Sequence, residues 1–235
     1  MRVKLITYTP NPEFIVASAA RLCYANTVNI ETLMENLTWE KIKTLVESLV
    51  ESGHASPLCQ INFTFAIEGI DRATSLQLLR HHVGLVADQR SQRYVNEENF
   101  QYIVPKAIAN SDMVSEYESF MQNIAGFYKR LLNAGFKKED ARSILPNACE
   151  TKLIITVNAQ ELLHIFNLRC CQRAQQPIRE LANEMLKLCK EVAPIIFKNA
   201  GASCVSLGYC PEGKHSCGKA PTLKEVMEVY NGQNS

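Results

Sequence analysis

The chain has 235 residues, of which 46% are hydrophobic and 21% charged, and its formal net charge is +1. This length can bury a sizeable core, as one large domain or two small ones. The near-zero charge excludes a generic nucleic-acid coat protein, which needs a strong basic excess, so no nucleic-acid partner is expected. Nine cysteines, without a secretory signal or a membrane-spanning run, predict a cytoplasmic protein with reduced thiols and no membrane partner.

Hydrophobic periodicity predicts a mixture of helices and strands without a run of βαβ units. In the first half of the chain the pattern predicts a strand at 3–8, helices from Pro12 to about Tyr24 and at 39–52, a strand at 61–67, and a helix from the cap Asp71 to about His82. In the second half it predicts a strand at 100–104, helices at 111–134 and 139–145, a strand at 152–157, and helices at 160–171 and 178–198. Pro194 should end or kink the last helix. The fold class predicted is α+β, with residues 1–200 as a single domain whose mostly antiparallel sheet is packed by helices, and residues 201–235 as a Cys- and Gly-rich tail without its own core.

The segment from Arg80 to Tyr94 carries three arginines, two histidines, two glutamines and a serine beside a short apolar stretch. Guanidinium groups are rarely buried without partners, but their planar fork of donors fits two phosphate oxygens at once. Gln77, Arg80 and His81 have helical spacing and are predicted to share one helix face. Ser91 to Arg93 offers the donors of an anion nest. The first hypothesis is a phosphorylated small molecule, and the alternative is a solvated, ion-paired surface turn.

Two further segments carry polar side chains where a ligand could reach them. His54 and Ser56 lie on a predicted turn, where the serine could instead bond its own backbone. Arg169 and Arg173 occupy a predicted helix end and the following turn. Arg179 falls in the first turn of the next helix, where its cation opposes the helix dipole. This placement indicates either an acidic partner or a functional role.

Taken together, these motifs resemble the flavin-dependent thymidylate synthases over nearly the whole chain. The family signature is Arg-His-Arg, seven residues, then Ser, and its two ends match Arg80-His81-His82 and Ser91-Gln92-Arg93-Tyr94. Other ordered matches are His54-x-Ser56-Pro57, Phe63-Thr64-Phe65, Leu145-Pro146-Asn147, Glu150-Thr151-Lys152, and Leu168-Arg169 through Ala174-Gln175 to Ile178-Arg179.

The resemblance implies a reaction and its cofactors. Deoxyuridine monophosphate (dUMP) would be methylated to thymidine monophosphate (dTMP), with methylene from methylenetetrahydrofolate and reducing equivalents from NADPH through FAD. No enzyme cysteine would be needed as nucleophile. The family also implies a homotetramer whose active sites take residues from different subunits.

The same resemblance assigns roles to residues of this chain. Arg179 matches the catalytic arginine proposed to stabilise ionised uracil at N3. The implied dUMP contacts are Gln77, Arg80, Ser91, Gln92, Arg93, Lys152 and Arg179. The implied FAD contacts are Ser56, Arg80, His81, His82, Gln89, Asn167, Arg169 and Arg173. His54 and Tyr94 match positions near the stacked rings.

Three departures from the family pattern leave a second function open. His82 replaces the second arginine of the signature, eight residues rather than seven precede Ser91, and Cys59-Gln60 stand where the family often has Glu-His. The alternative is a divergent, non-catalytic relative that binds flavin or nucleotide. In the tail, Cys204, Cys210, His215 and Cys217 are candidate ligands of a structural zinc ion, with free thiols as the other interpretation.

Overall fold

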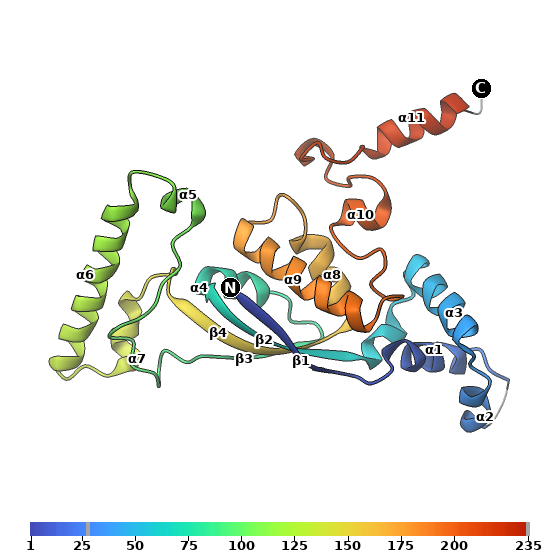
Figure 1. Ribbon diagram of the computed structural model, residues 1–235, viewed down its shortest axis with the longest axis horizontal. Helices are drawn as coiled ribbons and strands as arrows, with labels where there is room; N and C mark the ends of the chain where they lie inside the picture. The colour runs from blue at the N-terminus through green and yellow to red at the C-terminus, as the bar shows by residue number, and fades with distance from the viewer. Residues whose placement is uncertain (27–28, 234–235) are drawn as a thin grey trace. The chain divides into compact units, whose positions relative to one another are not determined.

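The structure is a computed structural model that describes residues 1–26 and 29–233. The described residues form a sheet of four strands in the order β1-β2-β4-β3 (Figure 1): β1 (Arg2–Tyr8), β2 (Asn62–Asp71), β3 (Leu85–Gln89) and β4 (Glu150–Asn158). The backbone N–H of residue 72 donates to the carbonyl of 149, while that of residue 159 donates to the carbonyl of 61. Because these pairs run in opposite directions along the chain, β2 and β4 are antiparallel. The predicted α+β class with an antiparallel sheet is confirmed.

The chain divides into two compact units, and each strand contributes residues to both. The first unit comprises Met1–Arg2, Ala66–Arg80 and Ala87–Ile155, and the second Val3–Phe65, His81–Val86 and Thr156–Ser235. The helices of the first unit are α4 (Arg72–Leu78), α5 (Lys106–Ala109), α6 (Val114–Asn133) and α7 (Lys138–Ala141). Those of the second are α1 (Pro12–Leu22), α2 (Ile30–Glu35), α3 (Trp39–Glu51), α8 (Ala159–Arg169), α9 (Gln176–Val192), α10 (Ser203–Leu207) and α11 (Leu223–Gln233). The division at residue 200 stays a prediction.

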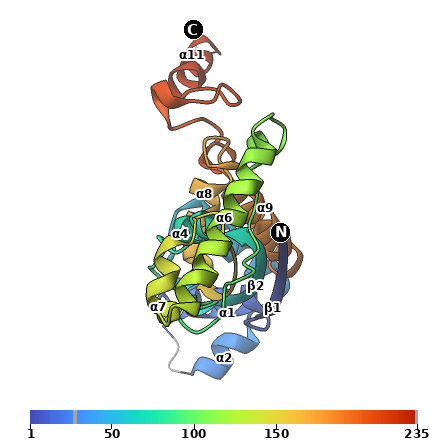
Figure 2. The ribbon, with the colours of Figure 1, turned by 90° about the vertical axis from the view of Figure 1, so that its left-hand side faces the viewer.

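Each unit buries its own apolar cluster. In the first, the long helix α6 packs Met121 against Phe100 and Cys149, and α7 lies beside α6 (Figure 2). In the second, α8 packs on α9, and the ring of Phe197 meets Phe63 and Phe166 edge-on at 5.5 and 5.8 Å. The edge-on geometry of aromatic rings adds to the free energy gained by burying them. Helix α8, which carries the predicted site residues Asn167 and Arg169, therefore lies on a well-packed base.

Helix α4 begins where the sequence predicts but ends earlier. The Asp71 carboxylate accepts the Thr74 N–H at 2.6 Å, which is the predicted N-cap. The helix then ends at Leu78, not near residue 82. The chain leaves the helix so that His81 enters the interior of the second unit, where its side chain is buried. The prediction that Gln77, Arg80 and His81 share one helix face is therefore wrong.

The strand predicted at 100–104 is also absent. Within this part of the described chain, Tyr102 forms an isolated antiparallel bridge to Cys149, the residue just before β4. Pro105 follows at once and has no N–H to extend a ladder. Strand β3 instead forms in the middle of the arginine-rich segment, for which the sequence pattern predicts no strand. Helix α9, predicted at 178–198, ends at Val192, as Pro194 predicts.

No helix of the described chain is long and apolar enough to span a bilayer.

Candidate functional site

The predicted nucleotide contacts fall mostly in the first unit. Six of the seven lie there, at the end of α4, after β3 and on β4: Gln77, Arg80, Ser91, Gln92, Arg93 and Lys152. The chain after β3 is fixed to β4, because the Arg90 N–H donates to the Lys152 carbonyl at 3.0 Å. The Arg72 guanidinium supports the same turn by donating to the Arg90 carbonyl at 3.3 Å. The sheet edge thus places the serine, glutamine and arginine of the signature next to the start of β4.

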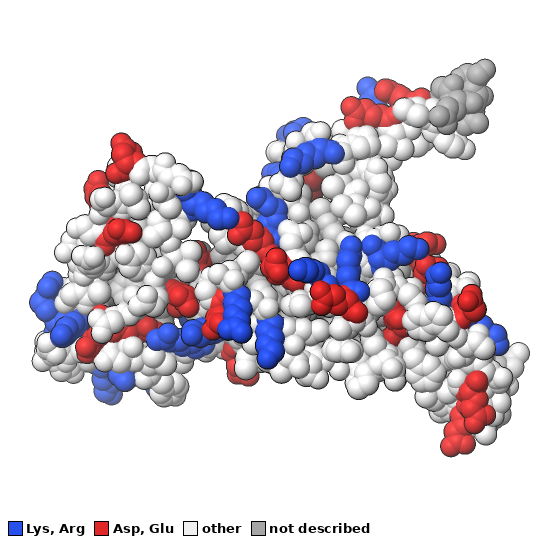
Figure 3. All heavy atoms as spheres, viewed as in Figure 1, with Lys and Arg blue, Asp and Glu red and all other residues white. Residues whose placement is uncertain are grey.

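Two cations of this set form ion pairs that water reaches. Arg93 bonds Glu139 at 2.7 Å, and Lys152 lies 3.6 Å from Glu68. Exposed pairs contribute only about 0–1 kcal/mol, so a phosphate could replace either carboxylate at little cost. Figure 3 shows cationic and acidic side chains interspersed over the face in view. The structure therefore contains the ion-paired turn that the sequence left as the alternative, and this turn is compatible with anion binding.

Gln89 and Tyr94 differ in how they are held. The Gln89 amide donates to the hydroxyls of Ser75 at 2.8 Å and Thr151 at 3.0 Å, within the first unit. Tyr94 is 73% exposed, and the Arg93 guanidinium lies 5.6 Å from the centre of its ring. Tyr94 is thus available for stacking on a planar ligand, whereas the Gln89 amide N–H₂ is engaged with two hydroxyl groups.

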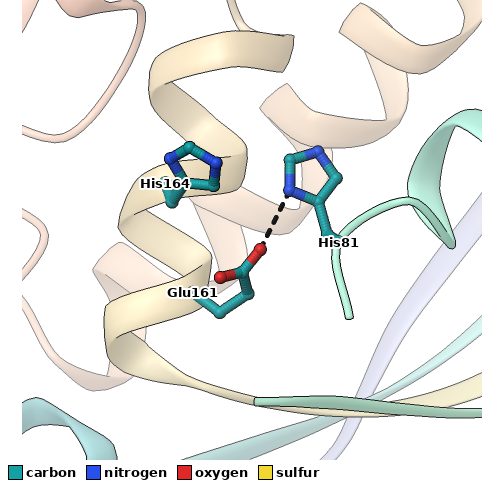
Figure 4. Close-up of side chains that lie close together, drawn as sticks. All are labelled: His81, Glu161 and His164. Carbon is teal, nitrogen blue, oxygen red and sulfur yellow. Dashed lines mark hydrogen bonds and ion pairs between the residues drawn. The ribbon is translucent and has the colours of Figure 1, made fainter. Parts of the chain in front are cut away.

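Glu161, His81 and Arg169 form a hydrogen-bonded chain in the second unit, and Figure 4 shows its two buried members, His81 and Glu161. The Glu161 carboxylate lies 2.9 Å from Nδ1 of His81, and Arg169 Nε donates to Nε2 of the same ring at 3.0 Å. An arginine N–H cannot bond a protonated nitrogen, so His81 carries its proton on Nδ1 and is neutral. The imidazole therefore connects a buried carboxylate to the guanidinium of Arg169. Both His81 and Arg169 are predicted flavin contacts.

The environment of His81 keeps the ring neutral. Burial lowers its pKa from the ordinary 6.5, and the Arg169 and His164 side chains lower it further, against the opposing effect of Glu161. Protonation would place a cation beside Arg169 and remove the acceptor at Nε2. Because the pKa is lower in the folded than in the unfolded chain, His81 makes the fold less stable as the pH falls through about 6.5.

The same region contains a group with metal-ligand chemistry that we do not assign to a metal. Potential ligand atoms of His81, Glu161 and His164 all lie within 4.8 Å of one another, and the two imidazole rings meet edge-on at 5.4 Å (Figure 4). However, both ring nitrogens of His81 already have partners. A divalent cation would also adjoin the permanent charge of Arg169. We therefore interpret Glu161 and His81 as groups that orient the Arg169 guanidinium, not as ligands of a cation.

Residues at the end of α8 line a cavity of about 710 Å³ in the second unit. Asn167, Arg169 and Arg173, all predicted flavin contacts, contribute to its wall, and Arg173 also pairs with Glu212 at 2.8 Å. Several cysteines line the cavity as well, including three of the four predicted zinc ligands: Cys204, Cys210 and Cys217. His215, the fourth, is not among the lining residues.

Arg179 is held by backbone carbonyls. Its Nη1 atom donates to the carbonyls of Gln172 and Ala174, both at 2.9 Å, which leaves Nη2 and Nε outside these two bonds. The sequence offered an acidic partner as one explanation for a cation at this helix start. In the structure, backbone carbonyls of the loop before α9 accept from Arg179 instead. This loop sets the direction of a guanidinium in the first turns of the helix.

The loop after His81 supports this hydrogen-bonded chain indirectly. Gly84 has φ +81°, and its carbonyl accepts the Asn158 N–H at 2.9 Å. Asn158 in turn caps α8 by accepting the Glu161 N–H at 2.8 Å. A Cβ at position 84 would lie 2.2 Å from the Asn158 amide nitrogen. Only glycine fits here, and it keeps the cap in the position that directs Glu161 toward His81.

Sequence reasoning missed Glu161. It lies 80 positions from His81 in the chain, and no short motif contains both residues. The available signal was local: an asparagine three residues before a glutamate is a helix N-terminus pattern, and it places the carboxylate in the first turn. His54, Ser56 and His82 are exposed and belong to the second unit. Their roles, like those of the other site residues, stay predictions.

Comparison with known proteins tests the resemblance directly. The family described as "Thymidylate synthase complementing protein" matches residues 4–195. The chain belongs to this family. A "Flavin-dependent thymidylate synthase" of Geobacter sulfurreducens is 47% identical over 97% of this chain and 98% of its own length. Proteins of the same name from Clostridium tetani and Pyrococcus abyssi are 44% and 37% identical, over 96% and 90% of this chain and equal shares of their own. The family resemblance drawn from the motifs is confirmed.

Proposed function

We propose that this protein is a flavin-dependent thymidylate synthase. It methylates dUMP at C5 of the uracil ring to give dTMP, with methylenetetrahydrofolate as the carbon source and NADPH as the reductant. The observation that carries this proposal is the 47% identity to a protein of that name over nearly the full length of both chains. The arrangement of the predicted site residues supports it in each of the two units.

The residues of the second unit fit the chemistry of FAD. A dinucleotide carries a diphosphate and a ring with carbonyl oxygens, so it needs cations and amide donors at the edge of a cavity. Arg169, Arg173 and Asn167 supply these groups in one cavity wall. When bound, FAD supplies the reducing equivalents that convert the transferred methylene to a methyl group. We assign Arg169, aligned by His81 and Glu161, to holding the cofactor.

The first unit offers the chemistry to hold dUMP. Arg93 and Lys152 carry the charges for a phosphate monoester, and both already bond carboxylates that a phosphate would mimic. Ser91 adds a hydroxyl and Gln92 an amide beside Arg93. Arg179 would stabilise negative charge on the uracil ring, because its guanidinium is oriented before substrate arrives. No cysteine is assigned as nucleophile in this scheme.

The purified protein tests the proposal in two steps. We expect a yellow protein that contains FAD and that oxidises NADPH and forms dTMP only when dUMP and methylenetetrahydrofolate are present. The same protein should let a thymidine-requiring bacterium grow. The Cys59→Ser variant serves as a control that keeps activity, since that thiol donates to the Gln160 side chain and is not assigned as a nucleophile. Bound flavin without dTMP formation would instead support the non-catalytic relative that the altered signature left open.

The His82→Arg variant tests the altered signature. The imidazole at position 82 is exposed, and an arginine there would add a permanent positive charge with a planar fork of donors. We expect tighter FAD binding, by roughly three- to tenfold, the equivalent of about 0.7–1.4 kcal/mol. Titration of flavin into the stripped protein, followed by fluorescence, measures the change. Looser binding would mean that the eight-residue interval before Ser91, not the charge at 82, sets the affinity.

We further infer a homotetramer and a reducing, cytoplasmic location. The tetramer rests on family membership, and light scattering of the purified protein should give the mass of four chains. Mixing two inactive variants, Arg179→Ala and Arg93→Ala, should restore part of the activity if each site takes residues from different subunits. The location rests on nine free cysteines, which an oxidising compartment would not preserve.

A further inference from the structure

An ion pair in the first unit closes the signature turn, the segment at 91–96 that carries three of the predicted nucleotide contacts. Arg90 precedes this turn and Glu97 follows it, and Nη2 of Arg90 lies 3.1 Å from a carboxylate oxygen of Glu97. The Glu97 side chain is 5% exposed, whereas the pair of Arg93 with Glu139 is open to water at both ends. Neither Arg90 nor Glu97 is among the predicted substrate or cofactor contacts.

Glu97 is the fixed end of this pair. Its N–H donates to the Tyr128 hydroxyl of α6 at 3.4 Å, and its carbonyl accepts the Phe100 N–H at 3.2 Å. Tyr128 is fully buried, and Phe100 belongs to the apolar cluster of the first unit. A packed interior resists displacement, so the carboxylate keeps its place if the guanidinium moves away. The core of the first unit therefore determines where the Arg90 side chain is held.

Arg90 joins the signature turn to the rest of the predicted nucleotide site. Its N–H donates to the Lys152 carbonyl at 3.0 Å, and its carbonyl accepts from the Arg72 guanidinium at 3.3 Å. Its side chain is 34% exposed, so packing alone does not fix it and the bond to Glu97 takes that role. Ser91 follows directly in the chain. A shift of Arg90 would therefore move Ser91 away from Lys152.

The contacts described within the signature turn are few. The Val95 N–H donates to the Ser91 carbonyl at 3.0 Å, and the Arg93 N–H donates to the Ser91 hydroxyl at 3.2 Å. From outside the turn, the Lys138 ammonium donates to the Tyr94 carbonyl at 3.1 Å in an exposed contact. A segment with few buried contacts opens readily unless its ends are held. The ion pair between its two flanking residues supplies that constraint.

The electrostatics of Glu97 distinguish this pair from the exposed pairs of the site. Burial raises the pKa of the Glu97 carboxyl above its ordinary 4.5, and the Arg90 and Arg72 guanidinium groups oppose this rise. Leaving a buried carboxylate without its cation is unfavourable. A phosphate can therefore displace the exposed partner of Arg93, but Glu97 stays on Arg90 when the nucleotide binds.

We propose that Glu97 is a positioning residue for nucleotide binding, which acts through Arg90 to hold the signature turn so that Ser91 and Arg93 face the phosphate of dUMP. This inference rests on the proposed function and adds to it a residue that touches no substrate. It has a specific consequence: the affinity that comes from the phosphate group depends on Glu97, whereas the affinity that comes from the uracil ring does not.

A comparison of dUMP with deoxyuridine, which lacks the phosphate, tests this role. Each ligand is titrated into the FAD-containing protein, and the ratio of the two affinities measures what the phosphate contributes. In Glu97→Ala we expect the affinity for dUMP to fall about tenfold, because a displaced turn misplaces its phosphate contacts. The affinity for deoxyuridine should stay at the wild-type value. The KM for dUMP should rise by a similar factor, with kcat nearly unchanged.

Three further variants separate positioning from folding. Glu97→Gln keeps an oxygen that accepts from Arg90, so it should recover part of the lost dUMP affinity. Arg90→Gln alters the partially exposed partner and leaves a donor for the buried carboxylate, so it tests the pair even if Glu97→Ala folds poorly. It should show the same selective loss. Glu98→Gln is the matched control, since this carboxylate accepts from the nearby Asn96 side chain, and it should bind dUMP like wild type.

The outcomes distinguish this inference from the proposed function. Equal losses of affinity for dUMP and deoxyuridine would show a general disturbance and overturn the positioning role. Wild-type discrimination in a folded Glu97→Ala or Arg90→Gln protein would do the same, while normal dTMP formation by the wild type left the proposed function standing. A wild-type protein that neither bound dUMP nor formed dTMP would remove the proposed function and this inference together.

Discussion

The Arg179→Ala variant should lose turnover by about 10²- to 10³-fold, while its affinity for dUMP falls much less. This is the size of effect seen when one preorganised donor to a developing negative charge is removed. The guanidinium is directed by the carbonyls of Gln172 and Ala174 before any ligand binds. Its contribution should therefore appear mainly in kcat, with the nucleotide phosphate still held by Arg93 and Lys152.

Steady-state kinetics and a dUMP binding titration separate these two effects. Lys187→Ala, on the exposed face of the same helix, is the matched control and should behave as wild type. Arg179→Lys should recover only part of the rate, because an ammonium group cannot reproduce the planar fork. Equal rates for wild type and Arg179→Ala would remove this residue from the mechanism.

Removing the Glu161 carboxylate should damage both stability and flavin binding. In Glu161→Ala the His81 Nδ1–H loses its buried acceptor, and Arg169 loses the anion that balances it across the ring. We expect the free energy of unfolding to fall by about 3 kcal/mol, typical of breaking a buried charged network. We also expect FAD affinity to fall about tenfold, the equivalent of about 1.4 kcal/mol.

The amide variant distinguishes positioning from mere packing. Glu161→Gln keeps an oxygen that accepts from His81 but removes the charge, so the fold should survive with a smaller loss of FAD affinity. Gln160→Ala, on the preceding and exposed position, is the control. Denaturant unfolding measures stability and flavin fluorescence measures binding. If both Glu161 variants bound FAD like wild type, the orientation of Arg169 would not depend on this carboxylate.

Local signals in the sequence predicted much of the fold. Pro177 and Pro194 bracket α9, and Asp71 caps α4, because fixed φ angles and side-chain caps act within a few residues. The strand predicted at 152–157 from its β-forming residues is β4, whose residues alternate in burial. The predictions that failed concern residues whose partners lie far away in the sequence. Helix α4 ends at Leu78, and His81, three residues further on, bonds Glu161 80 positions away; helical propensity does not encode such a contact.

For the candidate site, too, local features could be predicted and distant contacts could not. The arginines of the signature could be selected from sequence because their clustering is itself unusual. Which of them pair with carboxylates, such as Arg93 with Glu139, depends on segments 46 positions apart. Strand β3 was missed because its five residues lie among charged neighbours. It is an edge strand of the sheet, and it pairs with β4. Pairing across the sheet, not local preference, makes it a strand.

The packing of Gly84 against Asn158 has a practical consequence for mutational screens. A side chain at residue 84 would displace the amide that anchors the first turn of α8, and the disturbance would pass to a carboxylate three residues further along. Such a variant would be scored as defective in cofactor retention although residue 84 is not among the predicted ligand contacts. Library designs that vary this loop should therefore keep glycine at 84 and diversify its neighbours instead.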